Sequence, residues 1–246
     1  MQTGPILNIS CYLFVSLPDA AALRDRLHAR ADALGLKGTV LIAEEGINLF
    51  LAGLPEAVRT WVDELRADTR LKALTPKESW SETQPFQRLK VKVKPEIIRM
   101  NLPTVRPDKA PRAPALAPAT LARWLDQGHD DAGREIVMLD TRNGFEVDHG
   151  AFDGAVDWRL HKFSDFPAAL AAHRGELAGK TVVSYCTGGI RCEKAAMVLE
   201  AQGLTAWQLD GGILKYFEDT GGKHYHGSCF VFDEREALQA DLSPAR

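Results

Sequence analysis

The stretch Val182-Val183-Ser184-Tyr185-Cys186-Thr187-Gly188-Gly189-Ile190-Arg191-Cys192-Glu193-Lys194-Ala195-Ala196 decides how this chain folds. Its apolar start predicts a buried strand that ends at Cys186, its glycines predict a tight loop, and its last part predicts a helix that begins near Arg191. In such a strand–loop–helix unit the backbone N–H groups of Thr187 to Arg191 point into the loop, where the helix start adds partial positive charge.

A loop of this kind stabilises an anionic sulfur. Arg191 adds a full positive charge to the loop amides, and such surroundings lower a cysteine pKa from about 8.5 to roughly 3.5–7.5. We therefore expect Cys186 to be largely a thiolate at neutral pH. The alternative is an inert cysteine at the end of a core strand, but that reading leaves Gly188, Gly189 and Arg191 without a role.

The spacing of the loop narrows the chemistry. Cys186 and Arg191 form C-x-x-x-x-R, which resembles the loop of rhodanese domains and fits a sulfur atom or another small group on the thiolate. Cysteine phosphatases use a loop one residue longer, and this chain has a cysteine where their arginine would stand. The resemblance extends to Met138–Arg142, which ends in Asp-x-Arg before Phe145-Glu146, and to residues 209–213, which read Leu-Asp-Gly-Gly-Ile.

A proline-rich segment divides the 246 residues into two domains. Residues 102–118 form this predicted linker. Before it, the order β-α-β-β-α-β with one more strand predicts a ferredoxin-like α+β domain over residues 1–101. After it, strands separated by helical stretches predict a rhodanese-like α/β domain with a parallel sheet over residues 119–222, followed by a C-terminal extension, 223–246. The expected fold class is therefore α/β, with these two domains in this order.

The individual elements follow from apolar periodicity and from breakers. In the first domain we expect strands at 7–15, 38–43, 48–51, 74–80 and 89–93, and helices at 20–34 and 55–66. In the second domain we expect strands at 136–139 and 181–185 and a helix at 193–202.

Charge is unevenly distributed although the net charge is only -3. The first domain and linker are basic, the rest is acidic, and eight basic residues lie between Arg88 and Arg112 against Glu96 and Asp108. Lysines alternate with apolar residues over 89–94, so on a strand they share one face. That face is either a nucleic-acid-binding surface or a solvent-exposed strand face whose lysines protect a sheet edge against pairing with another chain. The candidate binding residues are Arg88, Lys90, Lys92, Lys94 and Arg99.

The remaining sequence signals argue for an ordinary intracellular protein. The N-terminus has no basic segment followed by an apolar one, so we expect no signal peptide. No apolar stretch is long enough to cross a membrane. The four cysteines show no C-x-x-C pair and no secreted disulfide pattern, and Cys229 beside His224 and His226 is only a weak metal pattern. We expect a cytoplasmic protein with no metal site.

Four motifs in one order now identify a narrower resemblance. They are Gly38–Asn48, Cys186–Ala195, Gly211–Tyr216 and Cys229–Arg235. Together they closely resemble the bacterial rhodanese-domain tRNA uridine hydroxylases, the TrhO family, over nearly the whole chain. The resemblance implies oxygen-dependent hydroxylation of the wobble uridine of tRNA to 5-hydroxyuridine. It further implies tRNA, through its anticodon arm, as the partner, molecular oxygen as co-substrate and no other evident cofactor. Neither DNA nor a membrane is expected as a partner.

The resemblance makes Cys186 the essential residue, and physical reasoning supplies the supporting roles. Arg191 is expected to stabilise an anionic sulfur species together with loop residues Thr187, Gly188, Gly189, Ile190 and Cys192. Asp140 and Arg142 are expected to support the loop through an ion pair. Cys192 is either a resolving thiol or a packed helix residue. Glu45 and Asn48 either contact tRNA or simply form a turn.

Two chemical routes and two other functions stay open. The Cys186 thiolate either adds to C6 of uracil, which makes C5 nucleophilic, or reacts first with oxygen to hold a transferable oxygen atom. The main alternative function is a sulfurtransferase that carries a persulfide on Cys186. A non-catalytic binding module is disfavoured because both Cys186 and Arg191 are present.

Overall fold

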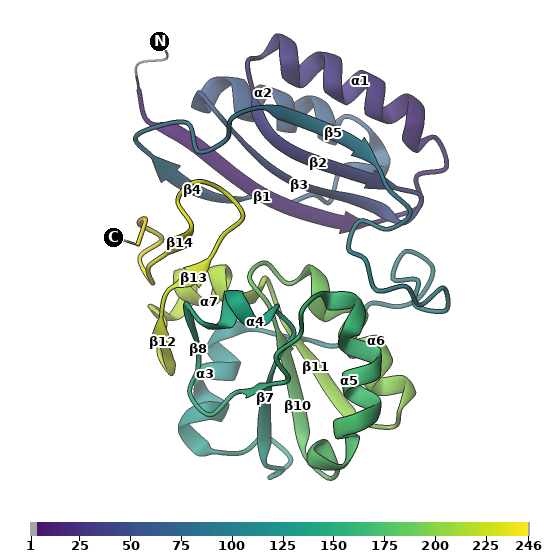
Figure 1. Ribbon diagram of the computed structural model, residues 1–246, viewed down its shortest axis with the longest axis vertical. Helices are drawn as coiled ribbons and strands as arrows, with labels where there is room; N and C mark the ends of the chain where they lie inside the picture. Colours follow the sequence, from purple (N-terminus) through teal and green to yellow (C-terminus); the bar gives the residue numbers. More distant parts are fainter. Residues whose placement is uncertain (1–3, 246) are drawn as a thin grey trace. The chain divides into compact units, whose positions relative to one another are not determined.

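The computed structural model describes residues 4–245, which form two compact units. The first unit contains residues 4–98, 107–110 and 232–235, and the second contains 99–106, 111–231 and 236–245. The chain therefore passes from the first unit to the second and returns briefly to the first twice, at 107–110 and near its C-terminal end at 232–235 (Figure 1). Among the described residues, no helix is both long enough and apolar enough to cross a membrane.

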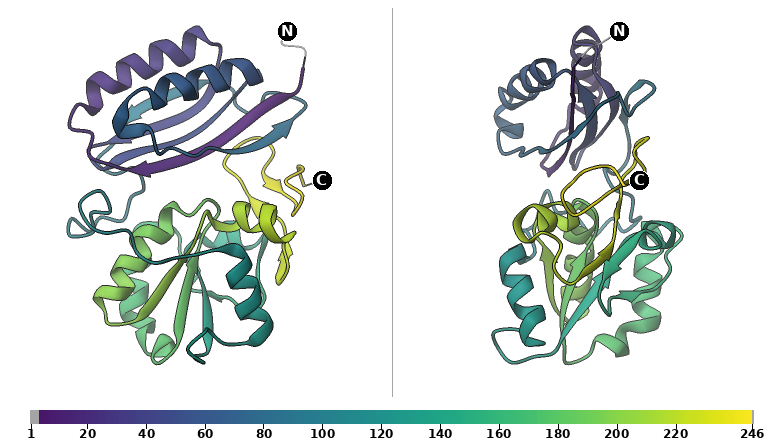
Figure 2. Two further views of the ribbon diagram at one scale, coloured as in Figure 1. Left: turned by 180° about the vertical axis from the view of Figure 1, so that it is seen from behind. Right: turned by 90° about the vertical axis from the view of Figure 1, so that its left-hand side faces the viewer.

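The first unit is a five-stranded sheet with two helices on one face (Figure 2). The strand order is β4-β1-β3-β2-β5; neighbours are antiparallel except β2 and β5, which are parallel. This arrangement confirms the predicted ferredoxin-like α+β fold with one added strand. Its elements are β1 (Ile6–Phe14), α1 (Ala20–Ala33), β2 (Lys37–Ala43), β3 (Gly46–Gly53), α2 (Pro55–Arg66), β4 (Lys77–Ser81) and β5 (Leu89–Val93).

Alternate residues of the strands build the core of this unit. Leu7, Ile9 and Cys11 of β1 point to the helix-covered face, where they belong to one buried cluster with Val58 and Trp61 of α2. The strand expected at 74–80 begins later, at Lys77. A 3-10 turn occupies Thr69–Leu71, and the Leu74 N–H donates to the Leu71 carbonyl, so both leucines enter the core before the strand begins.

The second unit is a parallel five-stranded sheet with helices on both faces (Figures 1 and 2). The order β6-β11-β10-β7-β9 places β10 at its centre. This confirms the predicted rhodanese-like parallel sheet. Its elements are β6 (Ala115–Leu116), α3 (Pro118–Gln127), β7 (Ile136–Asp140), α4 (Gly144–Val147), β9 (Val156–Asp157), α5 (Phe166–His173), β10 (Thr181–Tyr185), α6 (Ile190–Ala201), β11 (Thr205–Leu209) and α7 (Gly212–Thr220).

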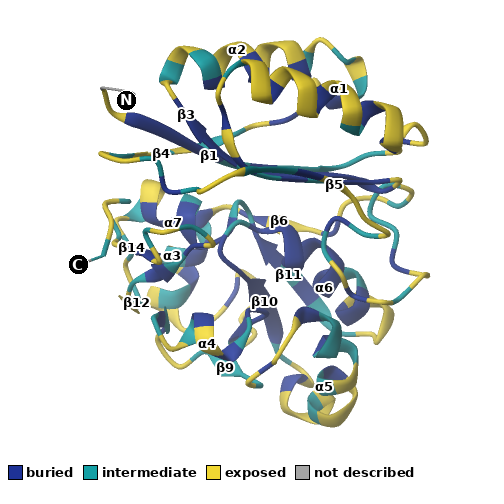
Figure 3. Cartoon of the chain, turned by 45° about the horizontal axis from the view of Figure 1, so that its top comes forward, coloured by how far each residue is buried: buried dark blue, intermediate teal, exposed yellow. Residues whose placement is uncertain are grey.

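Two segments outside the predicted rhodanese-like domain (residues 119–222) add to this unit. The end of the proline-rich segment forms the edge strand β6, where Gln208 donates its side-chain amide to the Ala113 carbonyl at 3.1 Å. C-terminal residues form β12 (Tyr225–Gly227), which pairs with β8 (Gly150–Phe152), and β13 (Cys229–Phe230), which pairs with β14 (Ala237–Leu238). Figure 3 shows that burial within each unit concentrates on the sheet strands and on the inner helix surfaces.

Candidate active site

Cys186 stands directly after the central strand of the second unit, at the edge where the parallel strands end. Tyr185 of β10 is paired with Asp140 of β7, so the loops after both strands meet at this edge. Gly189 adopts a left-handed φ of 99°, and its N–H donates to the Cys186 Sγ at 3.1 Å before α6 begins at Ile190. The loop therefore curls around the sulfur as the C-x-x-x-x-R spacing predicts.

Arg191 is held by a carboxylate that the sequence did not single out for this role. Its Nη1 and Nη2 donate to Oε1 and Oε2 of Glu146 at 2.6 and 2.8 Å, and both side chains are buried. Glu146 Oε1 also accepts from the Asn143 N–H at 3.0 Å, which fixes the carboxylate at the start of α4. The bidentate contact sets the orientation of the guanidinium beside the cysteine loop.

These contacts act on the ionisation of Cys186. Burial raises the pKa of its thiol, but three other effects outweigh burial: a hydrogen bond with Cys192, the charge of Arg191, and the N–H groups of Arg191 and Gly189. The net result is a pKa below the usual value for cysteine. Burial disfavours the charge on Arg191, but Glu146 and the sulfur more than offset this, so the pKa of Arg191 is raised.

Cys192 lies on the inner side of the same loop, on the first turn of α6. It is fully buried, and its Sγ lies 3.9 Å from Oγ1 of Thr141, whose hydroxyl also donates to the Tyr185 carbonyl at 2.9 Å. Burial and the neighbouring Cys186 sulfur raise the pKa of Cys192 well above its usual value. The pKa values of the two neighbouring thiols are therefore shifted in opposite directions, down for Cys186 and up for Cys192.

Asp140 and Arg142 form a fully buried ion pair below the loop. Asp140 accepts from the Arg142 backbone N–H at 3.0 Å and from its Nη2 at 2.6 Å. Arg142 in turn donates to the Gly150 carbonyl at 2.7 Å. The pair thus joins the end of β7 to β8, which fits a supporting role.

The beginning of α7 holds the cysteine loop from the other side. The Ile213 N–H donates to the Cys186 carbonyl at 3.0 Å, and the Leu214 N–H donates to the Thr187 carbonyl at 3.1 Å. Gly212, with φ 66°, approaches so closely that a Cβ there would lie 2.4 Å from the Cys186 carbonyl oxygen and 2.7 Å from the Gly189 nitrogen. The Leu-Asp-Gly-Gly-Ile motif is therefore a backbone support for the loop.

Replacing Gly212 with alanine should distort the loop and lower turnover strongly, because neither backbone atom can move without moving Cys186. Gly211→Ala is the matched control. Gly211 has a similar φ of 71°, so alanine suffers similar backbone strain, but its Cβ would meet the Lys215 side chain instead. The steady-state rate of the enzyme should fall much further in Gly212→Ala than in Gly211→Ala. The pKa of Cys186, followed by titration, should also shift more in Gly212→Ala. Equal losses in the two variants would contradict this account of Gly212.

The ionisation of Cys186 can be titrated directly, because the other three cysteines do not ionise in the same pH range. Burial raises the pKa of Cys11 and of Cys229 to about 12, and Cys192 is also raised. A lowered pKa means that the charged form persists as the pH falls below about 8.5. The ultraviolet absorbance of the Cys186 thiolate is obtained by subtracting the absorbance of Cys186→Ser from that of the wild type. As the pH is lowered, this difference should disappear with a midpoint below about 8.5. A midpoint at or above about 8.5 would contradict the site electrostatics.

Several basic residues of the first unit lie on the helix-free face of its sheet, while others lie on α1 and α2. One row of paired residues crosses all five strands and runs Lys77–Ser10–Phe50–Thr39–Lys90. Lys37 and Lys92 lie on the same face, and the strands place no Asp or Glu there. Within the described chain, Lys37, Lys90 and Lys92 form no ion pair. Lys94 follows β5, Arg88 precedes it, and Arg99 lies beyond in the second unit; all three are exposed.

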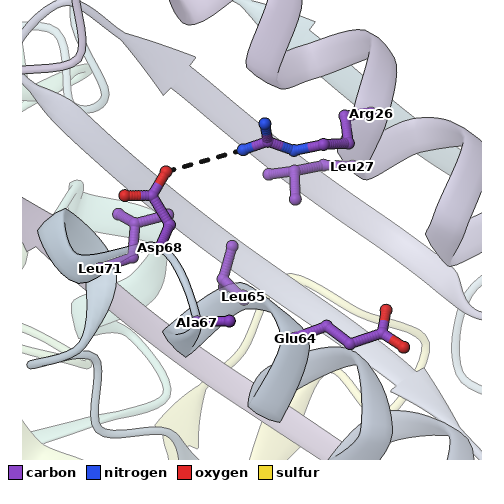
Figure 4. Close-up of a pocket in the computed structure, with 7 residues that line it drawn as sticks. All are labelled: Arg26, Leu27, Glu64, Leu65, Ala67, Asp68 and Leu71. Carbon is purple, nitrogen blue, oxygen red and sulfur yellow. Dashed lines mark ion pairs between the residues drawn. The ribbon is translucent and has the colours of Figure 1, made fainter.

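Two other places in the structure could in principle form a site. A hollow in the first unit lies between α1 and the end of α2, and it contains none of the predicted site residues (Figure 4). Two of the residues that line it, Arg26 and Asp68, form an ion pair at 3.6 Å. Among residues 4–245, no group of three or more His, Cys, Asp or Glu side chains is placed to hold a metal ion.

Comparison with known protein families matches each of the two units to a different domain family. Residues 6–97 match the UPF0176 acylphosphatase like domain, and residues 118–219 match the rhodanese-like domain. The chain is 66% identical over 239 residues to the tRNA uridine(34) hydroxylase of Delftia acidovorans, covering 97% of this chain and 90% of that protein. It is 61% identical over 241 residues to the protein of the same name from Bordetella petrii, covering 98% and 95%. The chain therefore belongs to the tRNA uridine(34) hydroxylase family.

Proposed function

We propose that this protein hydroxylates the wobble uridine of tRNA to 5-hydroxyuridine, with molecular oxygen as co-substrate and Cys186 as the essential residue. The observation that carries the proposal is a cysteine loop that stabilises a thiolate. The chain that contains this loop matches tRNA uridine(34) hydroxylases over almost its whole length. Its location is taken to be the cytoplasm, together with its tRNA substrate.

The chemistry of the site supports a nucleophilic thiolate. The charge of Arg191 and the Gly189 N–H stabilise the sulfur anion without neutralising it. In one route, the sulfur forms a bond to C6 of uracil and C5 becomes the nucleophile toward oxygen, forming a C5–O bond to a peroxide. A thiol reductant supplies the two electrons that cleave the O–O bond and release water. Loss of the C5 proton and cleavage of the S–C6 bond then release the hydroxylated base and the thiolate. In the other, Cys186 is oxygenated first. The neutral Cys192 thiol is a hydrogen-bond donor to the sulfur in both.

The tRNA is expected to bind partly through the first unit. Lysines at both edges of the helix-free sheet face, without acidic residues between them on the strands, suit a phosphate backbone. We assign this surface to the anticodon arm, with Arg88, Lys90, Lys92 and Lys94 as contributors. Arg99, which belongs to the second unit, is proposed as a separate contact to the RNA. The wobble base must leave its stack to reach a cysteine loop, which single-stranded anticodon loops permit at low cost.

Nucleoside mass spectrometry tests the proposal. Unmodified tRNA is incubated with the protein and a thiol reductant in air, beside an anaerobic control. The reductant is included because placing one oxygen atom on C5 and reducing the other to water consumes two electrons. Hydroxyuridine that forms only in air is the expected result. Its absence with competent tRNA would overturn the proposal.

A sulfurtransferase is the second candidate, because the C-x-x-x-x-R loop is sized for a single extra sulfur on Cys186. Thiosulfate:cyanide turnover by the same preparation separates the two. Turnover without any hydroxyuridine would make persulfide transfer the function.

A further inference from the structure

A half-exposed aromatic side chain stands beside the cysteine loop. Phe145 is 50% exposed, the largest exposure of any large apolar side chain among residues 4–245. It lies in α4 between Gly144 and Glu146, which are both buried. Its exposed ring face is therefore available to contact an apolar or aromatic ligand.

The backbone that carries Phe145 is held rigidly. The carboxylate of its neighbour Glu146 contacts Arg191 of the cysteine loop through two hydrogen bonds, at 2.6 and 2.8 Å. The Gly144 N–H donates to the Leu160 carbonyl at 2.8 Å, and Arg142 Nη1 donates to the Glu146 carbonyl at 3.3 Å. Phe145 is therefore presented from a fixed scaffold that is tied directly to the cysteine loop.

Two further rings stand with Phe145. Its ring meets that of Phe230 edge-to-face, with centroids 5.2 Å apart and an interplanar angle of 89°. The His149 ring also lies 5.2 Å from Phe230. The Phe230 carbonyl accepts from the Thr187 hydroxyl at 3.4 Å, and Thr187 directly follows Cys186. The aromatic cluster thus contacts the loop through Thr187 as well as through Glu146 and Arg191.

We propose that Phe145, backed by Phe230, is a stacking platform for the uracil ring that reacts at Cys186. A base removed from its stack loses the apolar contact of its neighbours, and an aromatic plane at the enzyme restores it. Uracil is flat and largely neutral, so a phenyl ring suits it without a charged partner. The inference rests on the proposed function, because uracil as the occupant comes from there.

Planarity is the property to test. Phe145→Leu keeps an apolar side chain but removes the plane, whereas Phe145→Tyr keeps the plane. Base stacking on an aromatic side chain contributes about five- to 150-fold in affinity, so Phe145→Leu should lower kcat/KM for an anticodon stem-loop RNA about tenfold or more. Phe145→Tyr should stay within about threefold of the wild type. Trp80→Leu, which removes a 44% exposed aromatic from the first unit, should leave kcat unchanged.

Two further readouts make the outcomes distinct. The thiolate titration of Cys186 should be unaltered in Phe145→Leu; a shift would mean that Phe145 acts through the loop, which overturns the platform. Wild-type kcat/KM in Phe145→Leu would also overturn it and would leave a protein partner as the occupant of the exposed ring. RNA affinity is measured by fluorescence anisotropy in every variant. If the wild type forms no hydroxyuridine but Phe145→Leu weakens RNA binding, the proposed hydroxylation fails, while the assignment of Phe145 as a base-stacking residue stands.

Discussion

Replacing Glu146 with glutamine is expected to lower the free energy of unfolding of the second unit by about 3–5 kcal/mol, the usual cost of breaking a buried ion pair from one side. The change leaves the shape of the side chain almost intact but leaves Arg191, whose side chain is 6% exposed, without its carboxylate. A buried guanidinium cannot escape by losing its proton, because arginine stays protonated at any ordinary pH.

The expected loss is large compared with the stability of a domain, which is typically about 5–15 kcal/mol. It should appear in chemical denaturation as a lower midpoint of the transition that reports on the second unit. Asp148→Asn is the matched control, because Asp148 lies two residues further on and pairs with Arg159 at 2.7 Å, but on the exposed surface. Exposed pairs contribute little, so this variant should unfold like the wild type.

Equal behaviour of Glu146→Gln and Asp148→Asn would contradict the assignment of Glu146 as the partner that stabilises Arg191. The two variants also differ in a second way. Only Glu146→Gln should change the titration of Cys186, because only Glu146 contacts the arginine next to the sulfur.

The cysteine loop could be predicted from the sequence because its signals are local. Strand, glycines, cysteine and arginine all fall within 182–196, and the structure places the sulfur, the Gly189 N–H and Arg191 together. The parallel sheet around β10 followed from similarly local patterns. The ferredoxin-like unit did too, although its fourth strand starts at Lys77 because the leucines before it enter the core from a turn.

The contacts that position the loop could not be predicted, because they join residues far apart in the sequence. Glu146 meets Arg191 across 45 residues, and in the sequence Glu146 stands out only as part of the rhodanese-like motif. The close approach of Gly212 to the Cys186 carbonyl likewise depends on how α7 packs. A glycine in a motif indicates that another part of the backbone lies close to it, but the sequence does not show which part.

The turn after β2 and the start of β3 also have contacts that could not be predicted from the sequence. Its sequence left Glu45 and Asn48 open between an RNA contact and a structural role. In the structure both are buried: Glu45 accepts from the Ile97 N–H at 2.8 Å, and Asn48 donates to the Ile97 carbonyl at 3.2 Å. These bonds fix the segment that follows β5, a task that only the folded chain reveals.

Loss of the Cys186 sulfur is expected to have the largest effect on activity. Serine has nearly the same shape but stays un-ionised at neutral pH, so Arg191 and the Gly189 N–H would stabilise no anion there. Removing a nucleophile lowers kcat by many orders of magnitude in well-studied enzymes, so Cys186→Ser should reduce hydroxyuridine formation at least about 1,000-fold. Cys11→Ala, which removes a buried thiol from the core of the first unit, should retain turnover.

The most direct test of the account is therefore the rate of hydroxyuridine formation by Cys186→Ser, measured by nucleoside mass spectrometry on tRNA in air beside the wild type and Cys11→Ala. A folded Cys186→Ser protein that binds tRNA but forms no detectable hydroxyuridine is the predicted result. Turnover by Cys186→Ser at a rate comparable with the wild type would contradict the account, because the reaction would then not depend on the thiolate that the loop is built to hold.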